Sequence, residues 1–159
     1  KIIMKLNSAV NFPSNAPQTC IECTSKCCTN RETVVLFPSE VDSFKKKVPD
    51  AENAIIEFTN KNGTTINTLK QTTKRKCYFL QEDGKCGIYE NRPLECKIYP
   101  VIMEFSDEAT KKKKNFFVKK EYCPLSDKIK VNEKELHKEI EKIKQNLSTD
   151  WISEYQKIP

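Results

Sequence analysis

Apolar residues recur with a helical period near the C-terminal end of the chain. Four of them are spaced i, i+4, i+7 and i+11 and so share one stripe of an α-helix: Leu136, Ile140, Ile143 and Leu147. Ser148 or Asp150 can cap a second, shorter helix that carries Trp151 and Tyr155. The pattern therefore predicts that the chain ends in two helices whose apolar sides pack in the core.

Shorter apolar runs upstream are typical of β-strands. The Asn62-Gly63 pair, the strongest short signal for a hairpin, lies between two of these runs. Two later runs are expected to form a second hairpin. The expected strands are residues 33–37, 54–58, 64–69, 77–80, 101–105 and 115–119.

Prolines set the limits of the short helices expected between these strands. A helix is predicted over about residues 38–47, with Ser39 as its cap and Pro49 as its stop. Pro93 suits the first turn of another short helix, which carries Cys96.

These elements predict a small α+β domain with short antiparallel strands, hairpins and a C-terminal helix. Residues 1–19 are expected to form an irregular N-terminal arm, because Pro13 and Pro17 interrupt any helix there. Residues 20–125 are expected to form the body of the domain, and residues 126–159 a helical segment packed on it.

The composition is that of a globular protein with a heavily charged surface, since 37% of the 159 residues are hydrophobic and 31% are charged. The net charge of +6 comes mainly from lysine, because only three residues are arginine. Base-specific recognition favours arginine forks, so the expected partner is a protein and not a nucleic acid. The four lysines at 111–114 are expected to lie in a solvated loop, with electrostatic docking as the alternative.

The sequence shows no segment that would carry it into or across a membrane. It has no run of 18 apolar residues, and its N-terminal residues are too polar for the apolar part of a signal peptide. The expected location is therefore the cytoplasm.

Cysteine is the outlying feature of the composition. The eight cysteines are Cys20, Cys23, Cys27, Cys28, Cys77, Cys86, Cys96 and Cys123. This even number fits either four disulfides in a secreted protein or two four-thiolate metal sites in a reducing compartment. Because a cytoplasmic location is expected, all eight are expected to be metal ligands that staple the fold.

The first four cysteines are close together in the sequence, whereas only the fold can assemble the last four. Two residues separate Cys20 from Cys23, a spacing at which a tight turn can chelate one metal. Adjacent side chains such as those of Cys27 and Cys28 normally diverge. This pair is therefore expected to serve two different sites, or to leave one redox-active thiol.

A set of thiolates without other ligands suits zinc or an iron–sulfur cluster. The only histidine, His137, is expected on the polar side of a helix. Thr24 follows Cys23, where a zinc knuckle usually has glycine, and Pro124 follows Cys123, as in many bacterial-type ferredoxins. These features favour one or two iron–sulfur clusters, with [4Fe–4S] as the favoured type and zinc as the alternative.

Residues 84–100, which read GKCGIYENRPLECKIYP, carry the most distinctive motif in the chain. They resemble a motif of the YkgJ-type cysteine-cluster family, the CxxCxxCC proteins, which are described as zinc- or iron-chelating. Residues 77–80 look like the C-x-F-L segment that precedes it, and residues 20–28 look like the opening cluster with one extra residue before Cys27. The resemblance covers about residues 20–125 and implies a metal cluster, without implying one reaction.

Several residues of this motif suit a place beside a cluster. Tyr89 and Tyr99 are large enough to shield it from water, with ordinary core packing as the alternative. Arg92 can offset the negative charge of thiolate-ligated iron. Pro93 fixes the backbone before Cys96 and is expected to leave helix N–H groups free to donate to sulfur.

No catalytic constellation is recognisable in the sequence, so enzymatic activity is not expected. The favoured function is a small iron–sulfur accessory protein that responds to redox state or oxygen and docks on a larger protein complex. A membrane-associated complex is compatible with this function. The alternatives are a zinc-stapled module that binds protein or RNA, and a small methyltransferase or oxidoreductase.

Overall fold

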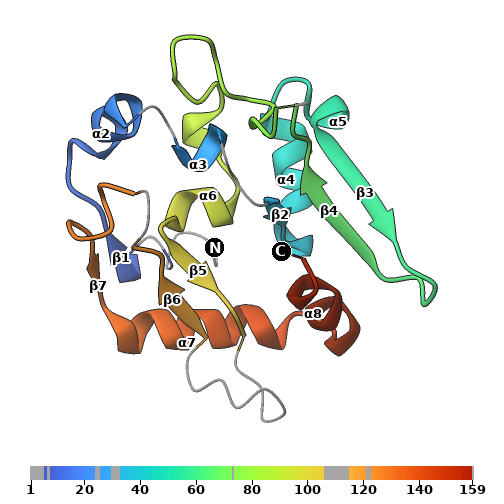
Figure 1. Cartoon of the computed structure of the whole chain (residues 1–159). Helices are drawn as coiled ribbons and strands as arrows, with labels where there is room; N and C mark the ends of the chain where they lie inside the picture. Colours follow the sequence, from blue (N-terminus) through green and yellow to red (C-terminus); the bar gives the residue numbers. More distant parts are fainter. Residues whose placement is uncertain are drawn as a thin grey trace.

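The computed structural model describes residues 6, 8–23, 26–29, 33–72, 74–105, 115–120 and 123–158. The lysine run 111–114 lies outside these residues. In the part that is described, helices are combined with three small antiparallel sheets, two of which lie at opposite edges of the molecule, and this confirms the expected α+β fold (Figure 1).

The helices and strands are short apart from one helix near the C-terminus. The helices are α2 (Ala16–Glu22), α3 (Lys26–Thr29), α4 (Pro38–Lys47), α5 (Ala51–Ala54), α6 (Leu94–Ile98), α7 (Glu133–Gln145) and α8 (Thr149–Gln156). The strands are β1 (Val10–Asn11), β2 (Val35–Leu36), β3 (Ile55–Thr59), β4 (Thr65–Leu69), β5 (Val101–Met103), β6 (Phe116–Val118) and β7 (Lys130–Val131).

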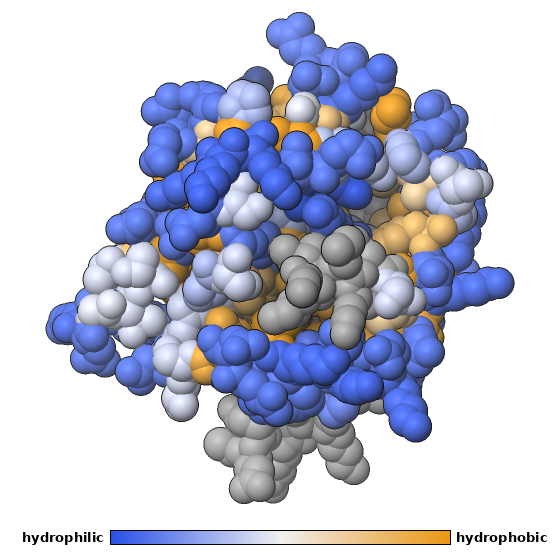
Figure 2. Space-filling model, turned by 180° about the vertical axis from the view of Figure 1, so that it is seen from behind, coloured by the Kyte–Doolittle hydropathy of each residue, from blue (hydrophilic) through white to orange (hydrophobic). Residues whose placement is uncertain are grey.

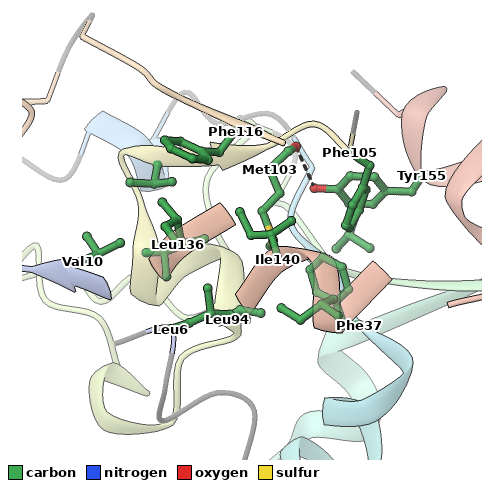
Figure 3. Packing of buried hydrophobic residues seen from close by; sticks show 14 of the residues in the cluster. Leu6, Val10, Phe37, Leu94, Met103, Phe105, Phe116, Leu136, Ile140 and Tyr155 are labelled. Carbon is green, nitrogen blue, oxygen red and sulfur yellow. Dashed lines mark hydrogen bonds between the residues drawn. The ribbon is translucent and has the colours of Figure 1, made fainter. Parts of the chain in front are cut away.

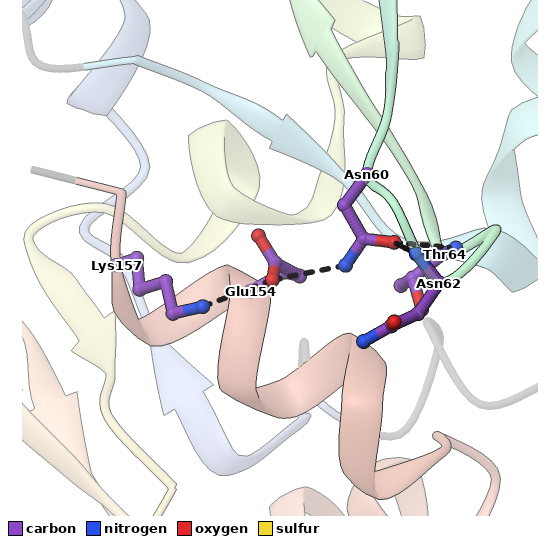
Figure 4. A network of polar contacts seen from close by, with 5 residues as sticks. All are labelled: Asn60, Asn62, Thr64, Glu154 and Lys157. Carbon is purple, nitrogen blue, oxygen red and sulfur yellow. Dashed lines mark hydrogen bonds and ion pairs between the residues drawn. The ribbon is translucent and has the colours of Figure 1, made fainter.

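The hairpin predicted at the Asn-Gly pair is confirmed. Strands β3 and β4 pair antiparallel, and β2 joins the other side of β4 to give the order β2-β4-β3. Gly63 takes the positive φ of 80° that this turn requires. The side-chain oxygen of Asn60 accepts bonds from the N–H groups of Asn62 and Thr64, and its amide donates to Glu154 of α8 at 3.0 Å (Figure 4). The hairpin is thereby fastened to the C-terminal helix.

The second predicted hairpin is also present, as the antiparallel pair β5 and β6. Near the N-terminus, β1 pairs antiparallel with β7, which lies just before α7. The expectation that Pro17 interrupts any helix is wrong, because Pro17 stands in the first turn of α2. Proline is tolerated there, since the first N–H groups of a helix have no partner within the helix.

Two local predictions are also wrong. Residues 77–80 form no strand: only Cys77 and Leu80 form isolated bridges, with Gln71 and Cys86, and turns lie between them. Ser39 does not cap α4. Pro38 is already the first helical residue, so the cap is the residue before it, and the N–H of that residue donates to the carboxylate of Glu40.

The main core lies where α7 and α8 meet the sheets (Figure 3). Leu136 and Ile140 of the predicted stripe are fully buried. Phe37, which follows β2, packs against Trp151 and Tyr155 of α8 with ring centroids 5.2 and 5.6 Å apart. The two predicted C-terminal helices are therefore confirmed, and Ser148 caps the second through a bond from the N–H of Trp151.

The surface is largely polar. Figure 2 shows hydrophilic residues over much of the face seen from behind, with smaller apolar areas between them. The large apolar side chains that are exposed in the described part of the chain are Ile56, Phe58 and Phe117. Within the same residues, no helix has the length and apolar character needed to cross a bilayer.

Candidate metal centre

All eight cysteines line one cavity of about 270 Å³. All of them are half-buried, all lie in the described part of the chain, and none forms a disulfide. The structure therefore brings together the near and the distant cysteines that sequence spacing alone kept apart. His137 is exposed on α7 as predicted and does not line the cavity.

Three parts of the chain carry these thiols to the cavity. Cys20 lies on α2, Cys23 directly follows that helix, and α3 carries Cys27 and Cys28. The turns after β4 and the helix α6 supply the next three thiols, and Cys123 follows β6. The N–H of Cys77 donates to the carbonyl of Cys28 at 2.7 Å, which fixes the turns against α3. The thiol of Cys23 lies 3.3 Å from the carbonyl of Cys20 one turn earlier.

The expected divergence of the adjacent pair is not observed. The sulfur atoms of Cys27 and Cys28 are 3.9 Å apart, and both thiols line the cavity. They stand on α3, a single helical turn, whose four residues place both side chains on the cavity side.

Burial makes several of these thiols poor acids. It raises the pKa of Cys20 to about 11, with the neighbouring charge of Cys27 as the next cause. The bond with Cys27 and burial raise the pKa of Cys28. Burial also raises the pKa values of Cys86 and Cys123, although backbone N–H groups that donate to their sulfurs act in the opposite direction. A bound metal must therefore displace protons from these thiols.

The cysteines raise one another's pKa values by the repulsion between their charges, and these effects fall into two groups of thiols, which we call neighbourhoods. Cys77 and Cys96 act on Cys28, and Cys77 acts on Cys86. Separately, Cys23 and Cys123 act on Cys20, and Cys23 acts on Cys123. Cys27 acts on members of both neighbourhoods and so lies between them.

The thiols surround a space and do not already form one coordination sphere. Among the described cysteine, histidine, aspartate and glutamate side chains, no three converge closely enough to hold a single metal ion as they stand. The donor set consists of sulfur alone, which suits zinc or an iron–sulfur cluster.

Comparison with known families matches residues 19–124 to CxxCxxCC, described as a "putative zinc- or iron-chelating domain". The chain belongs to the CxxCxxCC family. The matched residues contain all eight cysteines. No solved structure matches the chain.

One wall of the cavity in this CxxCxxCC protein combines a cation with aromatic rings. Tyr89, Arg92 and Tyr99 all line it, as the motif predicted. The guanidinium carbon of Arg92 lies 3.8 Å from the ring centre of Tyr89, and its Nε donates to the carbonyl of Tyr89 at 2.8 Å. The charge of Arg92 lowers the pKa values of Cys20 and Cys86, opposing the effect of burial.

Two carboxylates that the sequence analysis did not identify hold α6, the helix of Cys96. Glu40 is buried and accepts bonds from the N–H groups of Phe37 and Leu94 at 3.0 and 2.9 Å, so it caps α4 and α6 together. Glu95 accepts a bond from the N–H of Val35 at 2.8 Å and another from the hydroxyl of Tyr155 at 2.6 Å.

This arrangement corrects the expectation that the first N–H groups of α6 are free to donate to sulfur. The N–H of Leu94 is taken by Glu40, and the N–H of Cys96 is taken by the carbonyl of Pro93 at 2.9 Å. These two N–H groups at the start of the helix are therefore bonded to Glu40 and to the backbone.

Replacing Glu40 with glutamine is expected to change how stability depends on pH. Burial raises the pKa of Glu40 from 4.5 to about 7, so its carboxyl holds a proton more tightly in the folded chain than in the unfolded one. Its contribution to stability is therefore complete below pH 4.5 and is lost as the pH rises to about 7. That loss is about 3 kcal/mol of unfolding free energy, and the glutamine variant should not show it.

Urea unfolding of the metal-loaded protein across this pH range measures the difference. Glu57→Gln is the matched control, because Glu57 is exposed on β3 and should leave the pH profile of the wild type unchanged. Equal pH profiles for Glu40→Gln and the wild type would contradict the prediction.

Proposed function

We propose that this chain is a small iron–sulfur accessory protein, located in the cytoplasm, whose cluster responds to redox state or oxygen and which docks on a larger protein complex. The observation that supports it best is the single cavity lined by eight thiols. All eight cysteines are proposed as metal ligands, and enzymatic activity is not part of the proposal.

The size of the cavity supports a cluster over a single ion. Four thiolates around one zinc ion have their sulfur atoms about 2.3 Å from the metal, which leaves almost no free volume between them. Here the eight thiols, together with apolar and aromatic side chains, line a cavity of about 270 Å³. A cluster of several iron and sulfide atoms uses such a space without requiring the walls to collapse.

The two thiol neighbourhoods support two sets of four ligands. We assign one set, the inner set, to Cys28, Cys77, Cys86 and Cys96. We assign the other, the outer set, to Cys20, Cys23, Cys27 and Cys123. The adjacent pair then contributes one thiolate to each set, and four thiolates are what one [4Fe–4S] cluster takes.

A redox role follows from the chemistry of such a cluster. When bound, it supplies one-electron redox chemistry, and oxidative loss of the metal removes the folding energy that it contributed. The protein itself positions the thiols and places the positive charge of Arg92 beside them. Loosening of the cysteine-bearing segments can thereby change the binding of a partner.

Two surface features support docking on another protein. The net charge of +6 attracts an acidic surface over a distance. Ile56 and Phe58 are 49% and 59% exposed on β3, which forms the edge of its sheet. Exposed apolar side chains gathered on an edge strand are typical of contact surfaces.

Anaerobic purification followed by iron, sulfide and zinc analysis tests the proposal. We expect iron and acid-labile sulfide in equal amounts, together with the broad visible absorption of a cluster that bleaches in air. Partner capture should differ between anaerobic and air-exposed samples. A colourless protein that holds zinc and no iron would overturn the redox role.

A zinc-stapled interaction module is the second candidate, because the family is described as chelating either zinc or iron. Zinc would fill each four-thiolate set with one ion and would be stable in air. The same metal analysis separates the two candidates.

A further inference from the structure

A second cavity adjoins the thiol-lined one and has a different character. Its volume is about 340 Å³, in the range of small-molecule sites. We call it the side chamber. Cys20, Tyr89, Arg92 and Tyr99 line both cavities, so these residues form the wall between them. Lys97 of α6 lines the side chamber but not the thiol-lined cavity.

The side chamber has an excess of positive charge. Arg92 and Lys97 both line it and are half-buried, and Glu90 is its acidic residue. Among the residues that the structure describes, neither cation lies within ion-pair distance of a carboxylate, although the charge of Lys97 reaches Glu40 and lowers its pKa. Two half-buried cations on one wall favour the binding of an anion, and the planar guanidinium of Arg92 matches a carboxylate.

The remaining walls suit an organic body and not a bare inorganic ion. Phe12 and the rings of Tyr89 and Tyr99 provide aromatic surfaces, and Val10 and Leu125 add aliphatic ones. The accessible lining is more polar than apolar, so these apolar and aromatic side chains offer one surface for an organic body beside a polar one for its charged group.

We infer that the side chamber binds a small organic carboxylate whose charged group lies between Arg92 and Lys97 and whose apolar or aromatic body packs on the tyrosines. This inference goes beyond the proposed function, since it depends on the chamber and not on which metal the thiols hold. Because the two cavities share Arg92 and Cys20, a bound carboxylate would lie directly beside the metal centre.

Fluorine NMR of 4-fluorobenzoate tests this inference on the full, metal-loaded chain. We expect saturable broadening or a shift of the fluorine signal on addition of protein, reversed by benzoate and not by benzamide. Inorganic phosphate is the competing arm. If phosphate displaces 4-fluorobenzoate and benzoate does not, the chamber is an inorganic anion site, and the assignment to an organic carboxylate is overturned.

Variants that remove a positive or a negative charge from the wall of the side chamber test whether the probe binds there. Lys97→Gln should weaken 4-fluorobenzoate binding at least about tenfold, because it removes a charge-assisted hydrogen bond. Glu90→Gln should strengthen binding about threefold, because it removes a like charge. Lys46→Gln, an exposed change on α4 that also removes one positive charge, should leave binding unchanged.

Metal content, measured on every sample, separates this inference from the proposed function. Neither Lys97 nor Glu90 lines the thiol cavity, so both variants should hold as much metal as the wild type. The inference is overturned if no saturable binding occurs up to the solubility of the probe. It is also overturned if Lys97→Gln and Lys46→Gln bind the probe equally.

Discussion

Replacing Cys77 with serine is expected to remove about half of the bound metal, because it removes one ligand of the inner set and none of the outer set. A serine hydroxyl is a poor substitute for a soft thiolate at iron or zinc. The backbone bond from the N–H of residue 77 to the carbonyl of Cys28 does not depend on the side chain, so the turn itself can still form. We expect the free energy of unfolding to fall by on the order of 3 kcal/mol or more, as is typical when a structural metal is lost.

Lys76→Ser is the matched control, since it introduces the same residue one position earlier, at an exposed side chain that does not line the cavity. It should retain the full metal content and stability of the wild type. Iron, sulfide and zinc analysis of anaerobically purified samples, together with urea unfolding, gives both quantities.

A second variant makes the two-set assignment falsifiable. Cys123→Ser should also remove about half of the metal, but from the outer set, and the double variant with Cys77→Ser should hold almost none. Complete loss of metal in either single variant would show that the thiols act as one site. Full retention of metal in Cys77→Ser would remove Cys77 from the ligands.

Local patterns in the sequence were sufficient for the elements that local physics determines. The spacing of Leu136 and Ile140 requires a helix to bury both, and the structure buries both. Asn62-Gly63 sets a turn that few other residues permit. Residues 77–80 were wrongly predicted as a strand because their composition suits one, while the bridges of Cys77 and Leu80 fold the segment into turns.

The site was predictable only in part, because its assembly depends on the fold. Eight cysteines in a family motif indicated metal binding, but spacing could not show that all of them would face one cavity. The double cap by Glu40 joins residues 54 positions apart and leaves no local signal. A carboxylate three residues after Phe37 did hint at a helix cap, which could have identified Glu40 as the partner of that N–H. Lys97 lay within the motif, yet its place beside Arg92 in the side chamber required the structure.

The turns that carry Cys77 and Cys86 have few buried side chains to hold them, apart from partly buried ones such as Phe79 that pack against a smaller apolar cluster. Among the described residues between 70 and 87, no side chain is fully buried, and the backbone is joined mainly by turns and two isolated bridges. By contrast, Leu136 and Ile140 anchor α7 in the main core, to which no cysteine belongs. The order of the turns should therefore depend on the metal, whereas the order of α7 should not.

Removing the metal is accordingly expected to loosen one part of the chain and spare another. We expect amide hydrogen exchange in residues 76–87 to accelerate by on the order of a hundredfold after anaerobic chelation, because the bound metal is the main crosslink of this segment. Exchange in α7 should change little, since its buried contacts contain no thiol. Hydrogen-exchange mass spectrometry before and after chelation resolves the two regions, with Lys76→Ser as a metal-bearing reference. Equal acceleration in both regions would mean that the metal supports the entire fold. Unchanged exchange in residues 76–87 would mean that the metal does not stabilise this segment.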